Sequence, residues 1–226
     1  VLDSPFDYGK QAALYCPTHL PEPTDPAFVN AVAEEVFALC EITEGRAFVL
    51  FTSLRNMTEV HRLLQDRLPY RVLLQGERPK QALIADFKER PSVLFAAHSF
   101  WEGVDVPGDA LSLVIIDKLP FASPGDPVVS ARVDLLRSRG HEPFAEYQVP
   151  QAALALRQGF GRLVRSRRDR GIVAVLDRRL TTKRYGQAFL ESLPRCPRTP
   201  RREAIAGWWR QATAAPRGCP GEGASG

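Results

Sequence analysis

Six short apolar runs constrain the fold of this chain more than any other feature of its sequence. Several of them are rich in Val, Leu, Ile and Phe, and these lack the alternation of polar and apolar residues that marks a strand with one solvent-exposed face. Such runs are typical of strands that are buried on both faces of a parallel sheet. The runs occupy residues 12–16, 47–53, 71–75, 92–97, 111–117 and 171–177.

Segments with the periodicity of helices separate these runs or follow them. The segments are residues 25–42, 54–68, 79–90, 127–139 and 149–166. Since strands alternate with helices along the chain, we expect an α/β fold with a mostly parallel sheet flanked by helices.

Composition is that of a folded protein. Of the 226 residues, 44% are hydrophobic and 25% are charged, which suffices for a core of ordinary size, and the net charge of +4 indicates no particular partner. No apolar run is long enough to cross a bilayer, and no signal segment opens the chain. We therefore expect a cytoplasmic monomer without membrane contact. Because the chain opens without Met, we also expect it to be a fragment of a longer protein.

The four cysteines are Cys16, Cys40, Cys196 and Cys219. None belongs to a C-x-x-C pair, so their spacing does not fit a zinc site. Cys16 and Cys40 lie in apolar surroundings, which predicts buried, reduced thiols of the kind found in cytosolic proteins.

The stretch "RQGFGRLVRSRRDRG" (157–171) places glycines and many arginines in and just after a helical pattern. In a helix Gln158, Arg162 and Arg165 would share one face, because they are spaced i, i+4 and i+7. Each interior glycine costs about 1 kcal/mol relative to alanine, which is tolerable where another surface approaches the backbone closely. Guanidinium groups match phosphate oxygens, so the face suits an arriving phosphate. A solvated basic face is an equally weighted alternative.

The same helical pattern predicts core contacts at Leu154, Leu156, Phe160, Leu163 and Val164.

A second polar segment follows the run that ends at residue 97. Ser99, Glu102 and Asp105 are expected past the carboxyl end of a parallel strand, where open α/β sheets bind ligands, and Gly103 shapes the loop. The alternative is that the two carboxylates only cap and turn the loop.

A third segment, "FVLFTSLRNM", ends a strand and opens a helix. Thr52 or Ser53 is expected to cap that helix, and the same helix start can also bind a backbone phosphate of a nucleic acid.

These segments carry a family resemblance. "QGFGRLVR" (158–165) resembles motif VI, Q-x-x-G-R-x-x-R, of superfamily-two helicases, and "SFWEGVDVPG" (99–108) is similar to motif V of the XPD-like branch, in particular of bacterial DinG-type helicases. "LFTSL" (50–54) resembles motif IV, and "SPFDYGKQAALYCP" (4–17) and "IDKLPF" (116–121) also resemble that branch. Motifs IV, V and VI in this order are strongly specific.

The resemblance implies a second RecA-like motor domain over residues 1–193, followed by a C-terminal extension, 194–226, whose last part we expect to be disordered. ATP and Mg²⁺ would be shared with an N-terminal motor domain of the same protein, and single-stranded DNA would be the partner. Arg162 and Arg165 would be the arginines that act on the triphosphate. The implied nucleotide residues are Gln158, Gly161, Glu102, Gly103 and Asp105. The implied DNA contacts are Thr52, Ser53 and Arg55.

Several family features are absent from the sequence. It contains no G-x-x-x-x-G-K-[ST] phosphate loop, no acidic Mg²⁺ motif and no four-cysteine iron–sulfur module, all of which belong to the first half of such helicases. We therefore expect this chain alone to be inactive. The resemblance further implies 5′-to-3′ movement, often in DNA repair.

Two other function classes compete with the helicase. A nucleic-acid-binding module without a motor would explain the arginines but neither the glycines nor motif V. A Rossmann-like oxidoreductase is disfavoured because no G-x-G-x-x-G follows a strand.

Overall fold

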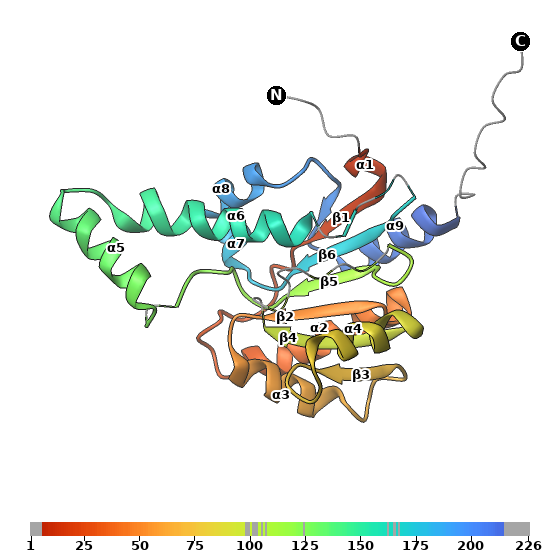
Figure 1. Cartoon of the computed structure of the whole chain (residues 1–226). Coiled ribbons are helices and arrows are strands. Elements are labelled where there is room, and N and C mark those ends of the chain that lie inside the picture. Colours follow the sequence, from red (N-terminus) through yellow and green to blue (C-terminus); the bar gives the residue numbers. More distant parts are fainter. Residues whose placement is uncertain are drawn as a thin grey trace, which may run out of the picture.

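A seven-stranded parallel sheet forms the centre of the molecule (Figure 1). The computed structural model describes residues 6–97, 100, 104, 106, 108–123, 125–161, 163–164, 166 and 168–214. The order across the sheet is β3-β4-β2-β5-β6-β1-β7. The strands are β1 (Ala12–Tyr15), β2 (Ala47–Phe51), β3 (Arg71–Leu74), β4 (Ser92–Ala97), β5 (Leu113–Ile116), β6 (Gly171–Val175) and β7 (Arg198–Thr199).

The helices are α1 (Tyr8–Gln11), α2 (Phe28–Thr43), α3 (Leu54–Leu64), α4 (Lys80–Glu89), α5 (Pro127–Ser138), α6 (Val149–Phe160), α7 (Arg179–Thr182), α8 (Gly186–Ser192) and α9 (Arg202–Ala214). A π-helix, Phe144–Gln148, leads directly into α6. None of the helices in the described part of the chain is long and apolar enough to cross a membrane.

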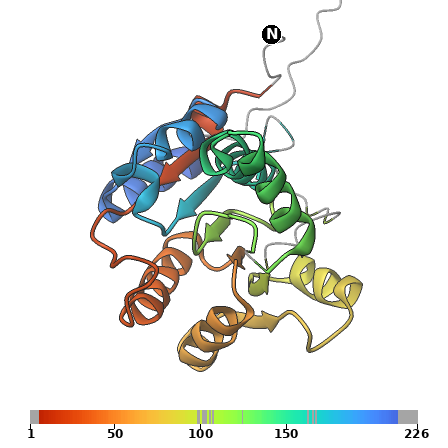
Figure 2. The ribbon, with the colours of Figure 1, turned by 90° about the vertical axis from the view of Figure 1, so that its left-hand side faces the viewer.

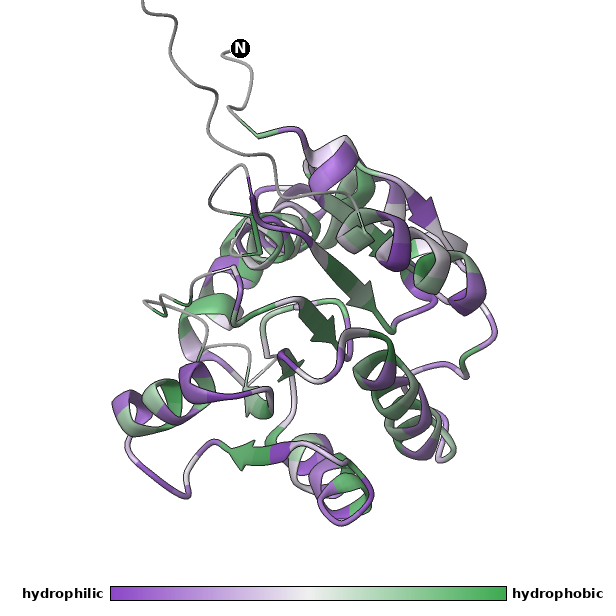
Figure 3. Cartoon of the chain, turned by 90° about the vertical axis from the view of Figure 1, so that its right-hand side faces the viewer, coloured by the Kyte–Doolittle hydropathy of each residue, from purple (hydrophilic) through white to green (hydrophobic). Residues whose placement is uncertain are grey.

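Each face of the sheet has its own hydrophobic core. Alternate strand residues enter a cluster with α4, α6 and α8 on one face, and a cluster with α2, α3 and α9 on the other. Figure 2 looks onto the carboxyl ends of the strands, with α2 and α3 on one side and α4 and α6 on the other. Figure 3 shows hydrophobic strands between helices whose outer faces are more hydrophilic. Burial on both faces explains why the runs of β1, β2, β4, β5 and β6 lack polar alternation, whereas β3 is only partly buried.

The fold class and all six predicted strands are confirmed. The predicted helices are also present, but the one expected over 149–166 ends at Phe160. Gly161 follows as its C-cap, and Leu163 and Val164 then turn into the core, where Leu163 packs against Gly171. Leu154 was wrongly predicted to be in the core: it is 48% exposed, because α6 buries the face formed by Ala152, Ala153, Leu156 and Phe160.

The segment after Pro194 continues on the same sheet. β7 pairs with β1 at the sheet edge, and α9 buries Ile205 in the second core. The guanidinium of Arg202 donates to the buried carboxylate of Glu35 on α2 at 2.9 Å, which ties α9 to α2. The end predicted to be disordered, 215–226, lies outside the described residues.

Candidate nucleotide and nucleic-acid sites

The predicted site residues that the structure describes lie on two opposite sides of the sheet. One side is formed by the carboxyl ends of the strands (the carboxyl edge) and the other by their amino ends (the amino edge). Thr52 and Ser53 follow β2 at the carboxyl edge, where the backbone N–H of Thr52 donates to Asp117 Oδ1 at 2.9 Å. The chain after α6 arrives instead at the amino edge, because Ser166 is bonded to Gln11, the residue before β1. The structure therefore separates the predicted DNA residues from Gln158 and Gly161.

The start of α3 forms the carboxyl-edge site. Ser53 is the N-cap of α3, with extended backbone and a side-chain oxygen that accepts from the Asn56 N–H at 3.4 Å, which confirms the cap prediction for Ser53. Thr52 and Arg55 are exposed beside it. A helix start with an exposed hydroxyl and an exposed guanidinium can receive a phosphate.

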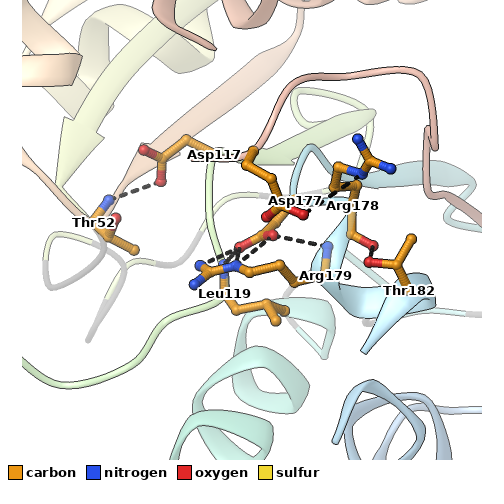
Figure 4. Close-up of polar contacts among 8 residues, drawn as sticks. Thr52, Asp117, Leu119, Asp177, Arg178, Arg179 and Thr182 are labelled. Carbon is orange, nitrogen blue, oxygen red and sulfur yellow. Dashed lines mark hydrogen bonds and ion pairs between the residues drawn. The ribbon is translucent and has the colours of Figure 1, made fainter. Parts of the chain in front are cut away.

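Two buried carboxylates, those of Asp117 and Asp177, lie at the carboxyl edge (Figure 4). Neither was among the predicted site residues. Asp177 follows β6 and accepts from the backbone N–H of Leu119 at 3.0 Å and from the Arg179 guanidinium at 2.6 Å. Asp117 follows β5, and its Oδ2 is buried without a hydrogen-bond partner among the described residues. Burial raises the pKa of Asp117 from 3.8 to about 6. The available signal was that each carboxylate ends an apolar run, in "LVIID" and "AVLD".

Asp117 should therefore make the free energy of unfolding depend on pH. Its folded-state pKa lies above the ordinary 3.8, so the folded state binds the proton more tightly, and stability should fall as pH rises from about 4 to about 6. In the wild type the free energy of unfolding should fall by an amount on the order of 2 kcal/mol over this pH range, and Asp117→Asn should abolish the fall. Denaturant unfolding of both proteins at pH 4, 5, 6 and 7 measures it. Parallel pH profiles would contradict the assignment.

The end of α6 forms the amino-edge site. Gln158 and Gly161 are exposed, and Gly161 has ordinary right-handed backbone, φ −65°. A Cβ on Gly161 would meet only the Arg157 carbonyl oxygen at 3.5 Å and that of Gln158 at 3.8 Å, which are ordinary contacts. Nothing in the described chain thus requires a glycine there.

Arg162 and Arg165 lie outside the described residues. The helical spacing used to place them on one face with Gln158 does not extend to them, because α6 ends at Phe160. Leu163 and Val164, which stand between the two arginines in the sequence, are each 1% exposed and belong to the core.

The segment between β4 and β5 connects the two edges. It begins at the carboxyl edge, where β4 ends at Ala97. It reaches the amino edge at Gly108, which lies so close to Asp169 that a Cβ on Gly108 would overlap the Asp169 carboxylate. Phe100, Val104 and Val106 are buried in the core shared with α6. Ser99, Glu102, Gly103 and Asp105 lie outside the described residues.

The end of α6 is open to solvent, and the described residues form no cluster that could hold a metal ion. The exposed end of α6 leaves the backbone of Gly161 open to a neighbouring group. Among the residues with described placement, no three His, Cys, Asp or Glu side chains are grouped to hold a metal ion.

Comparisons with known proteins give the family. The helicase C-terminal domain family matches residues 36–196. The ATP-dependent DNA helicase YoaA of Haemophilus influenzae is 46% identical over 200 residues, which is 88% of this chain and 31% of that protein. The ATP-dependent helicase DinG of Mycobacterium tuberculosis is 42% identical over 193 residues, which is 84% of this chain and 29% of that protein. The chain thus spans about a third of the length of the curated relatives it matches.

The fold agrees with this assignment. A solved XPD helicase superposes with a TM-score of 0.58 over 84% of this chain and 36% of that one, at 17% identity. The chain therefore belongs to the helicase C-terminal domain family.

Proposed function

We propose that this chain is the second motor domain of an ATP-dependent DNA helicase. Its amino edge faces ATP held by an N-terminal motor domain of the same protein, and its carboxyl edge holds single-stranded DNA. The observation that carries the proposal is the division of exposed polar residues between the two edges, with one segment, 97–108, connecting them. Such a connection allows a change at the nucleotide to reach the DNA.

Arg162 and Arg165 are the residues that act on ATP. Guanidinium groups stabilise the negative charge that spreads over the transferring phosphoryl group. Gln158 and Gly161 line the same rim. Mg²⁺ would neutralise phosphate charge, and its ligands come from the N-terminal domain, since the described residues supply none.

Gly161 tests whether another domain packs against α6. We expect Gly161→Ala to leave the free energy of unfolding unchanged or raise it by up to about 1 kcal/mol, since the backbone is right-handed and the space is open. In the full-length protein the same change should lower ATP turnover, because the added methyl group meets the neighbouring domain. Denaturant unfolding and steady-state ATPase assays measure the two effects. Wild-type turnover would mean that no surface approaches Gly161.

The two sites are coupled by Glu102, Gly103 and Asp105, since these residues belong to the connecting segment.

The DNA contacts are Thr52, Ser53 and Arg55, which bind backbone phosphates at the start of α3. Binding should therefore depend little on base sequence. The family resemblance of motifs IV, V and VI supports 5′-to-3′ movement in DNA repair, which an unwinding assay on 5′- and 3′-tailed duplexes tests.

The experiment on the DNA site is a salt titration of single-stranded DNA binding. The logarithm of the binding constant should fall with the logarithm of salt concentration by about 0.7 for each phosphate contact. We expect Arg55→Ala to make this slope shallower by about 0.7. The control is Arg62→Ala, a second exposed arginine of α3 that is paired with Glu59 at 2.6 Å. Equal slopes in the wild type and both variants would place the DNA elsewhere.

A further inference from the structure

The buried side chain of Gln11 joins the N-terminal segment to the turn that follows motif VI. Gln11 is 3% exposed and is the last residue of α1. Its Oε1 accepts from the Asp7 backbone N–H at 2.9 Å, and its Nε2 donates to the carbonyl oxygens of Ser166 at 2.7 Å and Asp169 at 3.2 Å. A buried amide whose oxygen and nitrogen are both bonded to backbone groups permits few other positions of that turn.

The turn is also closed by its own side chains. The Asp169 carboxylate accepts from the Ser166 backbone N–H at 2.8 Å and from the Ser166 hydroxyl at 2.6 Å. The Ser166 hydroxyl oxygen accepts from the Arg168 backbone N–H at 3.2 Å. Ser166, Arg168 and Asp169 are therefore bonded into one compact unit, which Gln11 holds from one side.

Gly108 meets the same unit from another side. A side chain at this position would overlap the Asp169 carboxylate, so the absence of a Cβ lets the segment between β4 and β5 lie against the turn. Three segments that are distant in the sequence thus meet at Asp169: the N-terminal segment, the end of motif V and the turn after motif VI.

Ser166 directly follows Arg165 in the chain, and buried Val164 directly precedes it. The two described neighbours of Arg165 are thus both held in place, Val164 by the core and Ser166 by Gln11. We infer that Gln11 is a positioning residue for the reaction: by holding Ser166, it sets where the chain presents Arg165 to ATP. The inference rests on the proposed function, because it assigns the arginines to ATP.

The test combines two measurements on Gln11→Leu. In the 226-residue chain, hydrogen exchange at the Ser166 and Arg168 amides should rise by about tenfold, because the turn opens more often. In the full-length protein, kcat for DNA-stimulated ATP hydrolysis should fall by about tenfold to a hundredfold while KM for ATP stays within about twofold, since a displaced catalytic group costs rate rather than binding.

Two further variants make the result specific. Gln11→Glu keeps the acceptor for Asp7 but presents a carboxylate to the two turn carbonyls, so it should be as defective as Gln11→Leu. Thr43→Val is the matched control: Thr43 is 1% exposed, and its hydroxyl donates to the carbonyls of Leu39 and Gly45 at the end of α2. It should lower stability without changing kcat.

Three outcomes would overturn the inference. These are unchanged exchange in Gln11→Leu, wild-type kcat despite faster exchange, or an equal loss of kcat in Thr43→Val. Wild-type kcat in Gln11→Glu would also overturn it, because Gln11 would then act through Asp7. The proposed function fails separately, through near-normal turnover in Arg162→Ala and Arg165→Ala, whatever Gln11 does.

Discussion

Replacing Arg165 by alanine in the full-length protein is expected to lower ATP turnover by about 10³- to 10⁵-fold, and the same holds for Arg162→Ala. Each change removes a guanidinium that stabilises charge on the transferring phosphoryl group. The fold should survive, because both variants keep the neighbouring Leu163 and Val164, which are buried in the core. Steady-state ATP hydrolysis at saturating single-stranded DNA measures the effect.

The matched control for these variants is Arg157→Ala. Arg157 is exposed on α6 and belongs to the same arginine-rich stretch, but it lies outside the Q-x-x-G-R-x-x-R pattern. It should retain turnover within a few-fold of the wild type. If Arg162→Ala and Arg165→Ala behave like Arg157→Ala, the arginines form a solvated basic surface, which is the alternative that spacing alone left open.

The buried strands could be predicted from the sequence because their environment is uniform, whereas the short, partly exposed β7 was missed. A strand such as Gly171–Val175 is buried on both faces, so every position is apolar and the run is continuous. The end of α6 could not be predicted in this way. Leu163 and Val164 continue the helical spacing of apolar residues, but they reach the core through a turn that packs on Gly171, and spacing does not distinguish the two cases.

The division of the site between two edges also escaped the sequence. The sequence placed Ser99, Glu102 and Asp105 past the carboxyl end of a strand, but it did not indicate at which end of the strands the helix with Gln158 finishes. The chain after α6 arrives instead at the amino edge, where β6 then begins. Gln11 and Asp177 were missed for a related reason: their partners lie 155, 158 and 58 residues away in the chain, and no local pattern records such contacts.

The 226-residue chain by itself should hydrolyse almost no ATP and should bind nucleotide weakly. Its sequence has no phosphate loop, and its described residues form no metal site. Two arginines can stabilise a transition state, but they cannot hold ATP in place or position the metal ion. Robust turnover by the chain alone would mean that it contains a complete ATP site, and the half-motor proposal would be wrong.

Addition of the N-terminal motor half should restore ATP turnover that depends on single-stranded DNA. The measurement compares ATP hydrolysis by residues 1–226, by the full-length protein and by its Arg165→Ala variant, each with and without single-stranded DNA. The same comparison separates the helicase from a nucleic-acid-binding module without a motor. A binding module would gain no ATP turnover from a second domain. A motor half should gain it, and the gain should be lost in Arg165→Ala, because in the proposed function the arginines act on a triphosphate that the other domain presents.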